Sequence, residues 1–172
     1  RGIDSFINDD HRHDKCSDAT CTSIEFPNYK MFYKLRCENP DIDWAVLELN
    51  AEIICDYKCA FNWTNAGDSA SYSIPIKKRM TQSALESLFE DKEGYPTRDE
   101  LKIPDWYPTN PQAEILVFDV IPVSHIKKVN FIDRDTFLRY HDIIPPDINA
   151  EINRNLFYPR QDYKFWRGQE DD

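Results

Sequence analysis

The apolar run at residues 113–120 most constrains what this chain can fold into. It is largely apolar, and Pro122 ends it. A short run of this kind predicts a strand that is buried on both faces, at the centre of a sheet. Residues 91–111 come directly before it and are rich in proline. They predict a long irregular loop, and long loops inside compact domains are often functional.

The other predicted elements are also short. Because strands follow one another without regular helices between them, a doubly wound sheet is disfavoured and the predicted class is α+β. A chain of 172 residues suits one domain, so we expect residues 1–172 to form a single unit. Further strands are predicted at residues 22–26, 44–49, 59–63, 126–132 and 156–158, and helices at residues 28–36, 81–90 and 133–140.

Composition excludes several classes of protein. Glycine is scarce, with 4 residues, and neither GxGxxG nor GxxxxGK[ST] occurs, which disfavours Rossmann and P-loop nucleotide sites. The net charge of −10 opposes general coating of nucleic acid, although it leaves room for a local basic site. No apolar run approaches the roughly 18 residues that a membrane span needs, so we expect no membrane association.

The cysteines indicate the redox compartment. There are 5 of them, an odd number in a chain that is not small, which disfavours a disulfide framework and favours a reducing, cytoplasmic location. Cys55 and Cys59 are expected to be buried. His11, His13 and Cys16, followed by Cys21, are zinc ligand types, but their spacing matches no standard finger. We therefore expect no metal and favour a polar loop near the cleft.

Glu114 stands at the head of the central apolar run. Residues two apart on a strand point to the same side, so Gln112 and Glu114 are predicted to share a face. Burying a carboxylate is costly unless it is paired or used, and pairing with a neighbouring backbone or an arginine is the simpler interpretation. The other interpretation is catalytic. Cleaving the nicotinamide–ribose bond of NAD builds positive charge on the ribose carbon, which a carboxylate hydrogen-bonded to the ribose hydroxyls stabilises.

Three segments give that second interpretation its weight. They are SIEFPNYKMFY at residues 23–33, FNWTNA at residues 61–66 and QAEILV at residues 112–117. In this order and spacing they resemble the DarT family of ADP-ribosyltransferases, toxins that modify single-stranded DNA, over residues 23–129, with a similar tail at residues 156–160. The resemblance implies a split-sheet ADP-ribosyltransferase fold with a central NAD cleft and NAD as substrate. It also implies a thymidine or guanosine acceptor in single-stranded DNA and a role as a toxin or in phage defence. The implied partner is an antitoxin, an ADP-ribosyl hydrolase with a macrodomain.

The resemblance also assigns roles to individual residues. Glu114 would be the catalytic glutamate, with Gln112 beside it and facing the acceptor base together with the loop at residues 95–111. The residues that it implies for NAD are Asn28, Met31, Tyr33, Thr64 and Asn65. Those that it implies for the nucleic-acid substrate are Lys30, Arg36 and Trp106.

Departures from the family pattern keep alternatives open. Family members carry an early strand with a histidine that contacts NAD, and we expect this strand to be missing here. Many relatives have an arginine where Asn28 stands. DNA-binding relatives tend to be basic, whereas this chain is acidic, although residues 77–79 and 160–167 carry local positive charge, the latter among aromatics. The alternatives are a transferase that acts on RNA or protein, and an inactive module that binds NAD or a nucleic acid.

Overall fold

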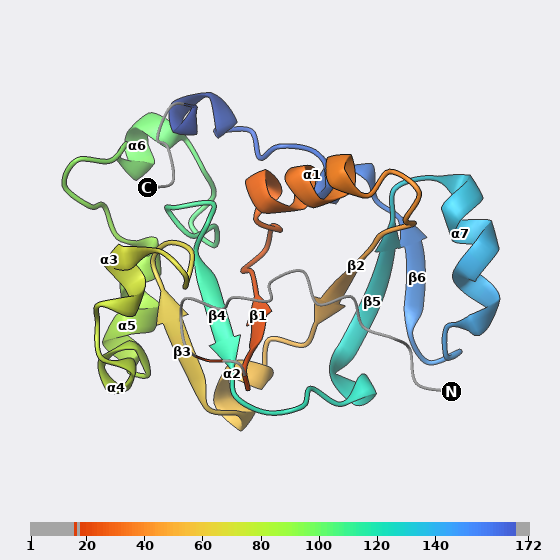
Figure 1. The fold of residues 1–172 in the computed structure, drawn as a ribbon, viewed down its shortest axis with the longest axis horizontal. Helices are drawn as coiled ribbons and strands as arrows, with labels where there is room; N and C mark the ends of the chain where they lie inside the picture. Colours follow the sequence, from red (N-terminus) through yellow and green to blue (C-terminus); the bar gives the residue numbers. More distant parts are fainter. Residues whose placement is uncertain (1–15, 17, 168–172) are drawn as a thin grey trace.

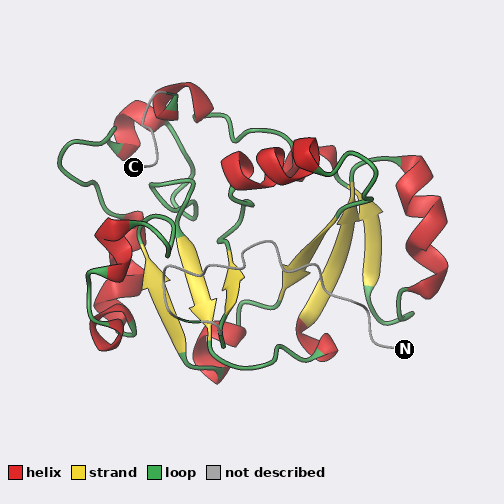
Figure 2. Ribbon diagram, viewed as in Figure 1, coloured by secondary structure: helices red, strands yellow, loops and turns green. Residues whose placement is uncertain are grey.

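The computed structural model describes residue 16 and residues 18–167. Two three-stranded sheets form its frame (Figures 1 and 2). The first is antiparallel and has the order β1 (Thr20–Thr22), β4 (Glu114–Val117), β3 (Cys59–Asn62). The second has the order β2 (Ala45–Leu49), β5 (Ile126–Phe131), β6 (Asn149–Ile152), with β5 antiparallel to β2 and parallel to β6. The chain passes between the two sheets three times, from β1 to β2, from β2 to β3 and from β4 to β5, and this is the predicted α+β, split-sheet arrangement.

Helices lie around the edges of the two sheets (Figure 1). The longest, α1 (Tyr29–Glu38), runs above both sheets, and α7 (Arg134–Tyr140) covers the outer side of the second. The short helices are α2 (Ile53–Asp56), α3 (Ser69–Tyr72), α4 (Ile76–Arg79), α5 (Gln82–Glu86) and α6 (Arg98–Leu101). Turns of 3-10 helix are η1 (Ser87–Phe89), η2 (Val123–His125), η3 (His141–Ile143), η4 (Arg154–Phe157) and η5 (Tyr163–Trp166). None of these described helices combines the length and the apolar character that a membrane crossing requires.

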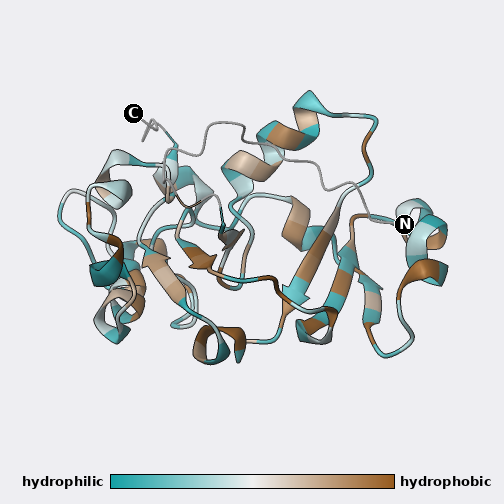
Figure 3. Cartoon of the chain, turned by 60° about the horizontal axis from the view of Figure 1, so that its bottom comes forward, coloured by the Kyte–Doolittle hydropathy of each residue, from teal (hydrophilic) through white to brown (hydrophobic). Residues whose placement is uncertain are grey.

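Strand β4 is the centre of the first sheet, as the apolar run predicts. It is buried at every position and lies between β1 and β3. Its side chains alternate between two hydrophobic clusters, with Ile115 and Val117 in one and Leu116 in the other. Each such side chain contributes about 1.5–3 kcal/mol when fully buried. Figure 3 shows hydrophobic residues on the strands of both sheets. The core therefore fixes β4, and with it the position of Glu114.

Two predicted strands differ from the structure. The one expected at residues 22–26 is displaced, because β1 ends at Thr22 and the next residues bend, with Glu25 at a φ of 59° and the Phe26 amide bonded to the Ile24 carbonyl. The strand expected at residues 156–158 is wrong. That segment is the 3-10 turn η4, and the third strand of the second sheet is β6, which pairs with β5.

The predicted loop, one predicted helix and one cysteine also differ from the structure in detail. The loop at residues 91–111 contains the short helix α6, which begins with a capping box formed by Thr97 and Glu100. The predicted helix at residues 81–90 consists of α5 and η1. Cys59 is buried as expected, but Cys55 is exposed.

Candidate active site

Glu114 is the first residue of β4, and only 5% of it is exposed. Its Oε2 accepts a hydrogen bond of 2.8 Å from the backbone N–H of Ala66, and Nδ2 of Asn65 lies 3.5 Å from its Oε1. Both partners follow β3, the strand that pairs with β4. A hydrogen bond to a charged group contributes about 1.5–3 kcal/mol. The turn after β3 therefore orients the carboxylate at the end of the central strand.

A buried side-chain network joins the strands beside this carboxylate. Asn62 is opposite Glu114 in the sheet, and its Nδ2 donates to the Glu114 backbone carbonyl at 3.3 Å. Its Oδ1 accepts from Nη1 of Arg79 at 2.6 Å, and only 4% of Arg79 is exposed. Neither residue was predicted from the sequence. Arg79 stands in a basic triplet that is typical of a solvated face, and its partner Asn62 is 17 residues earlier, so no local signal marks its burial.

Gln112 lies outside β4. Residues 110–113 form a turn, in which the Ala113 amide bonds to the Asn110 carbonyl at 3.1 Å and the Gln112 amide bonds to Asn110 Oδ1 at 2.8 Å. The alternation rule holds within a strand, so the prediction that Gln112 and Glu114 share a strand face has no basis at this position. Gln112 is nevertheless buried, at 8% exposure, two residues before the carboxylate.

Two arginines hold the loop that leads to Glu114. The guanidinium of Arg98 donates to the carbonyls of Pro104, Asp105 and Tyr107 and to Oγ1 of Thr109, at 2.8–3.2 Å. That of Arg160 donates to the carbonyls of Pro108 and Thr109, at 2.8 and 2.9 Å. Buried carbonyls need donors, and an irregular loop offers few of its own. The two arginines supply those donors, so the loop is fixed although it lacks regular structure.

Arg160 is itself part of a buried ion pair. Its Nε and Nη2 donate to the two carboxylate oxygens of Asp162, at 2.7 and 2.5 Å. Trp166 donates to the same carboxylate from Nε1 at 2.9 Å. All three residues are at most 2% exposed. Residues 160–166 therefore contain a buried, bidentate ion pair that Trp166 of η5 also contacts. Through Arg160 this pair holds the loop before Glu114 in place.

The same pair acts on Tyr29, the first residue of α1. Burial and, after it, the charge of Asp162 raise the pKa of the Tyr29 phenol from 10.0 to about 12, against an opposing contribution from Arg160. The neutral phenol is thus favoured in the folded state. Its contribution to stability is complete below pH 10 and is lost as the pH rises toward 12.

We therefore expect one phenol of the folded protein to titrate at about 12. Absorbance titration of tyrosinate in the wild type and in Tyr29→Phe gives this phenol as the difference between the two curves. A difference curve with its midpoint near the ordinary value of 10.0 would contradict the burial of Tyr29 against Asp162.

The residues predicted to bind NAD occupy two places. Asn28 caps α1, is 2% exposed, and has a buried Nδ2 without a hydrogen-bond partner in the described part of the chain. Thr64 is buried and Asn65 contacts Glu114, both in the turn after β3. Met31 and Tyr33 are 39% and 61% exposed on α1. Positions five apart on a helix point roughly 140° apart, so Tyr33 does not face the same way as Asn28.

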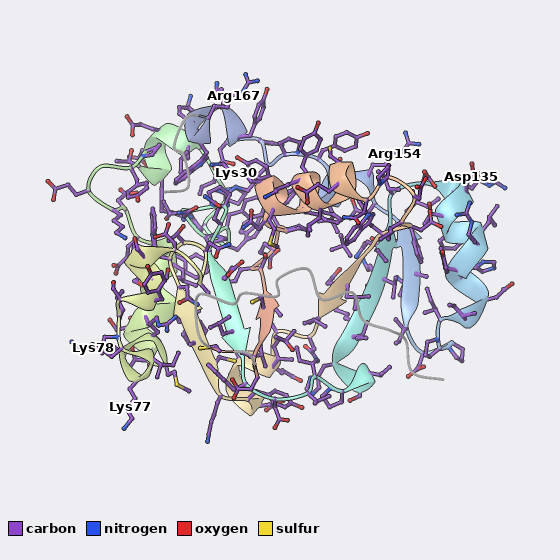
Figure 4. The ribbon with its side chains drawn as sticks, in the orientation of Figure 1. Lys30, Lys77, Lys78, Asp135, Arg154 and Arg167 are labelled. Atoms are coloured by element: carbon purple, nitrogen blue, oxygen red, sulfur yellow. The ribbon has the colours of Figure 1, made fainter. Side chains whose placement is uncertain are left out.

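The residues predicted to bind the acceptor are spread more widely. Lys30 is half-buried in the first turn of α1 (Figure 4). Arg36 lies further along that helix, and its guanidinium packs over the rings of Phe32 and Phe157, at 5.2 and 5.7 Å. Trp106 is 62% exposed in the loop that Arg98 holds. The structure therefore leaves Trp106 accessible, whereas the Arg36 guanidinium is packed against aromatic rings.

In the described part of the chain, no group of His, Cys, Asp and Glu is placed to hold a metal ion, and His11 and His13 lie outside that part. A cavity of about 1500 Å³ separates the two sheets. It is lined by β1, β2 and the residues after β4, and it reaches Ile115 and Pro27, the neighbours of Glu114 and Asn28. A smaller cavity of about 260 Å³ is lined by residues of β3, α4 and α5.

A family model and several solved structures are similar to this chain. A family model described as "DarT: ssDNA thymidine ADP-ribosyltransferase, DarT" matches residues 13–159. No curated protein matches the chain. Among solved structures it is similar to Thermus sp. 2.9 DarT in complex with carba-NAD+, with a TM-score of 0.54 and 13% identity over 82% of this chain and 74% of that chain. It is also similar to Thermosipho africanus DarTG in complex with ADP-ribose, with a TM-score of 0.53 and 15% identity over 82% of this chain and 36% of that chain. At these identities the structural likeness shows the fold alone.

Proposed function

Because this chain belongs to the DarT family, whose model matches residues 13–159, we propose that it transfers ADP-ribose from NAD to a base of single-stranded DNA. The family description names thymidine as the base. The chain is accordingly an NAD-dependent ADP-ribosyltransferase. The observation that carries the proposal is the Glu114 carboxylate, which is buried at the head of β4 and oriented by the Ala66 amide.

Glu114 would act on the ribose that carries nicotinamide. When the bond from the ribose carbon to nicotinamide breaks, nicotinamide leaves with the electron pair and the ribose becomes cation-like. The Ala66 N–H holds Oε2 of Glu114, while Oε1 accepts a hydrogen bond from a ribose hydroxyl and stabilises the positive charge. A base nitrogen then attacks the ribose carbon and loses its proton, which completes the transfer.

Asn28 supports the placement of NAD beside this carboxylate. Strand β1 is antiparallel to β4 with Thr22 opposite Ile115, so Ser23 is level with Glu114. Ser23 Oγ accepts from the Asn28 backbone amide at 3.2 Å, which brings Asn28 to the same end of the sheet. The unpartnered Nδ2 of Asn28 is a donor that an oxygen of NAD would satisfy. The adjoining cavity between the sheets gives room for the rest of the dinucleotide.

The acceptor would approach across the fixed loop. Single strands are held by bases stacked on aromatic side chains and by phosphates near cations. Trp106, Tyr163 and Phe165 are 62%, 41% and 37% exposed, on this loop and on η5 in the tail. Lys164 and Arg167 lie over the rings of Phe165 and Tyr163, at 5.1 and 5.7 Å. This combination supports a nucleic-acid acceptor in spite of the overall negative charge.

The acceptor is tested by incubating the protein with labelled NAD and, in separate reactions, single-stranded oligonucleotides, RNA and cell extract. We expect label on the thymidine-containing DNA oligonucleotides. If label appears only on RNA or only on protein, that molecule is the acceptor and the proposal of a DNA acceptor is wrong. Calorimetry that detects oligonucleotide binding but no NAD binding would indicate an inactive binding module.

The proposed role in the cell is that of a toxin with a partner antitoxin. Modification of DNA bases harms the cell that makes the enzyme, so we propose that an ADP-ribosyl hydrolase with a macrodomain removes the modification. The odd number of cysteines, 5 in a chain that is not small, supports a reducing, cytoplasmic location. Growth arrest on expression, relieved by co-expression of such a hydrolase, tests this role.

A further inference from the structure

The cavity of about 260 Å³ beside β3 differs in charge from the rest of the molecule. The chain has 31 acidic residues and a net charge of −10, yet no aspartate or glutamate of the described residues lines this cavity. Lys78, Arg79 and Lys92 line it, together with hydroxyl side chains that include Thr64, Ser71 and Ser83. A concave surface that carries only positive charge concentrates anions.

Two buried donors on the wall of this cavity lack partners. Arg79 uses Nη1 for Asn62, but its Nε is buried and makes no hydrogen bond with any described residue. The same is true of Nε1 of Trp63, another residue of the wall. A buried donor without a partner costs about 1–3 kcal/mol, so Arg79 and Trp63 hold hydrogen-bonding capacity that no described residue uses.

The volume of this cavity, about 260 Å³, limits the size of the anion that it can hold. Pockets for drug-sized ligands and cofactors measure about 300–1000 Å³, so a dinucleotide exceeds this cavity, whereas a phosphate group with its nearest neighbours fits. Lys92 also lies 4.5 Å from the centre of the Trp63 ring. A cation and an indole side by side are the two elements that hold a single strand, one for its phosphate and the other for an adjoining base or sugar.

The cavity adjoins the active site through β3. Asn62 lines it and is also opposite Glu114, and Thr64 lines it immediately before Asn65, the neighbour of the Glu114 carboxylate. The sheet order β1-β4-β3 places it on the side of β4 away from β1 and from Asn28, the cap beside β1 that we assign to NAD. This position is suited to the acceptor strand rather than to the pyrophosphate of NAD.

We propose that this cavity binds a backbone phosphate of the single-stranded DNA, close to the nucleotide that receives ADP-ribose. The proposal rests on the proposed function for the identity of the strand. Lys78 and Lys92 contact the phosphate from the open side, and Arg79 forms the base of the cavity. The cavity thereby fixes the register of the strand with respect to Glu114.

The neighbouring lysines of α4 provide a matched test. Lys78 lines the cavity and Lys77 does not, and the two side chains project from α4 in different directions (Figure 4). Fluorescence anisotropy of a labelled oligonucleotide, measured without NAD over a range of salt concentrations, gives the dissociation constant and its salt slope. We expect Lys78→Ala and Lys92→Ala each to lower the slope by about 1 and to weaken binding roughly fivefold at about 0.15 M salt. Lys77→Ala is expected to match the wild type.

Three results would overturn the assignment. Equal weakening by Lys77→Ala would indicate general attraction rather than a site. Unchanged DNA binding with weaker NAD binding by calorimetry in Lys78→Ala would assign the cavity to the phosphates of NAD. Unchanged binding of both ligands in Lys78→Ala and Lys92→Ala would leave the cavity without a role. Because binding is measured without NAD, a wild type that binds DNA but transfers no label refutes the proposed function and leaves the phosphate site standing.

Discussion

Replacement of Glu114 by glutamine is expected to lower the rate of ADP-ribose transfer by roughly 10²- to 10³-fold, with little effect on folding. Glutamine keeps the shape of the side chain and retains an oxygen for the Ala66 N–H, which donates to Oε2 of Glu114 at 2.8 Å. It removes the negative charge that, in the proposed mechanism, stabilises the cation-like ribose. Since that charge develops only as the nicotinamide bond breaks, the loss falls on the rate and not on the affinity for NAD.

The measurement is the initial rate of label transfer to an oligonucleotide, together with the melting temperature and the dissociation constant for NAD. Glu90→Gln, at an exposed position, is the matched control and should transfer at the wild-type rate. Glu114→Ala should also abolish transfer, but it leaves the buried Ala66 N–H without an acceptor and so perturbs stability as well. Transfer at the wild-type rate in Glu114→Gln would remove Glu114 from the mechanism.

Replacement of Arg160 by methionine is expected to have the largest effect on stability. The ion pair with Asp162 is almost completely buried, and removal of one partner from such a pair costs about 3–5 kcal/mol, because the other charge stays uncompensated. The carbonyls of Pro108 and Thr109 lose their donor at the same time. For a domain of this size, each kcal/mol corresponds to a shift of about 2–4 °C in the melting temperature.

Urea unfolding of Arg160→Met measures this loss, and Arg139→Met is the control. Arg139 pairs with Asp43 at the surface, where water screens the interaction, so its loss should be much smaller. The double variant Arg160→Met, Asp162→Leu should recover part of the stability, since it removes both buried charges. Equal effects of Arg160→Met and Arg139→Met would contradict a structural role for the buried pair.

Local patterns predicted the parts of this fold that depend on local causes. The apolar run that became β4, the strands at β2, β3 and β5 and the helices α1 and α7 all carry their signal within a few residues. Strand β6 does not, because its sequence Asn-Ala-Glu-Ile favours a strand only when β5 lies beside it. The segment at residues 156–158 has the more strand-like composition, but it forms the turn η4 instead.

The residues of the candidate site also fall into those that local sequence predicted and those that it did not. Glu114 and Asn65 were found from their position in a resembling segment, and they lie in contact. Arg79 and Arg160 were missed because the partners that bury them are distant in sequence. Arg160, for example, donates to a carbonyl 52 residues earlier. Charge in a sequence is therefore a poor guide to burial, since the carbonyls and amides that compensate it belong to other segments.

The position of Arg160 in the chain also has a consequence for biosynthesis. A ribosome completes Glu114, both sheets and the whole of the loop before it reaches Arg160 and Asp162. Until then the carbonyls of Pro108 and Thr109 lack their donor. A chain that stops before Arg160 thus carries the Glu114 carboxylate without the guanidinium that fixes the loop before it. An ordered loop before Glu114 would therefore arise only after Arg160 and Asp162 have been synthesised.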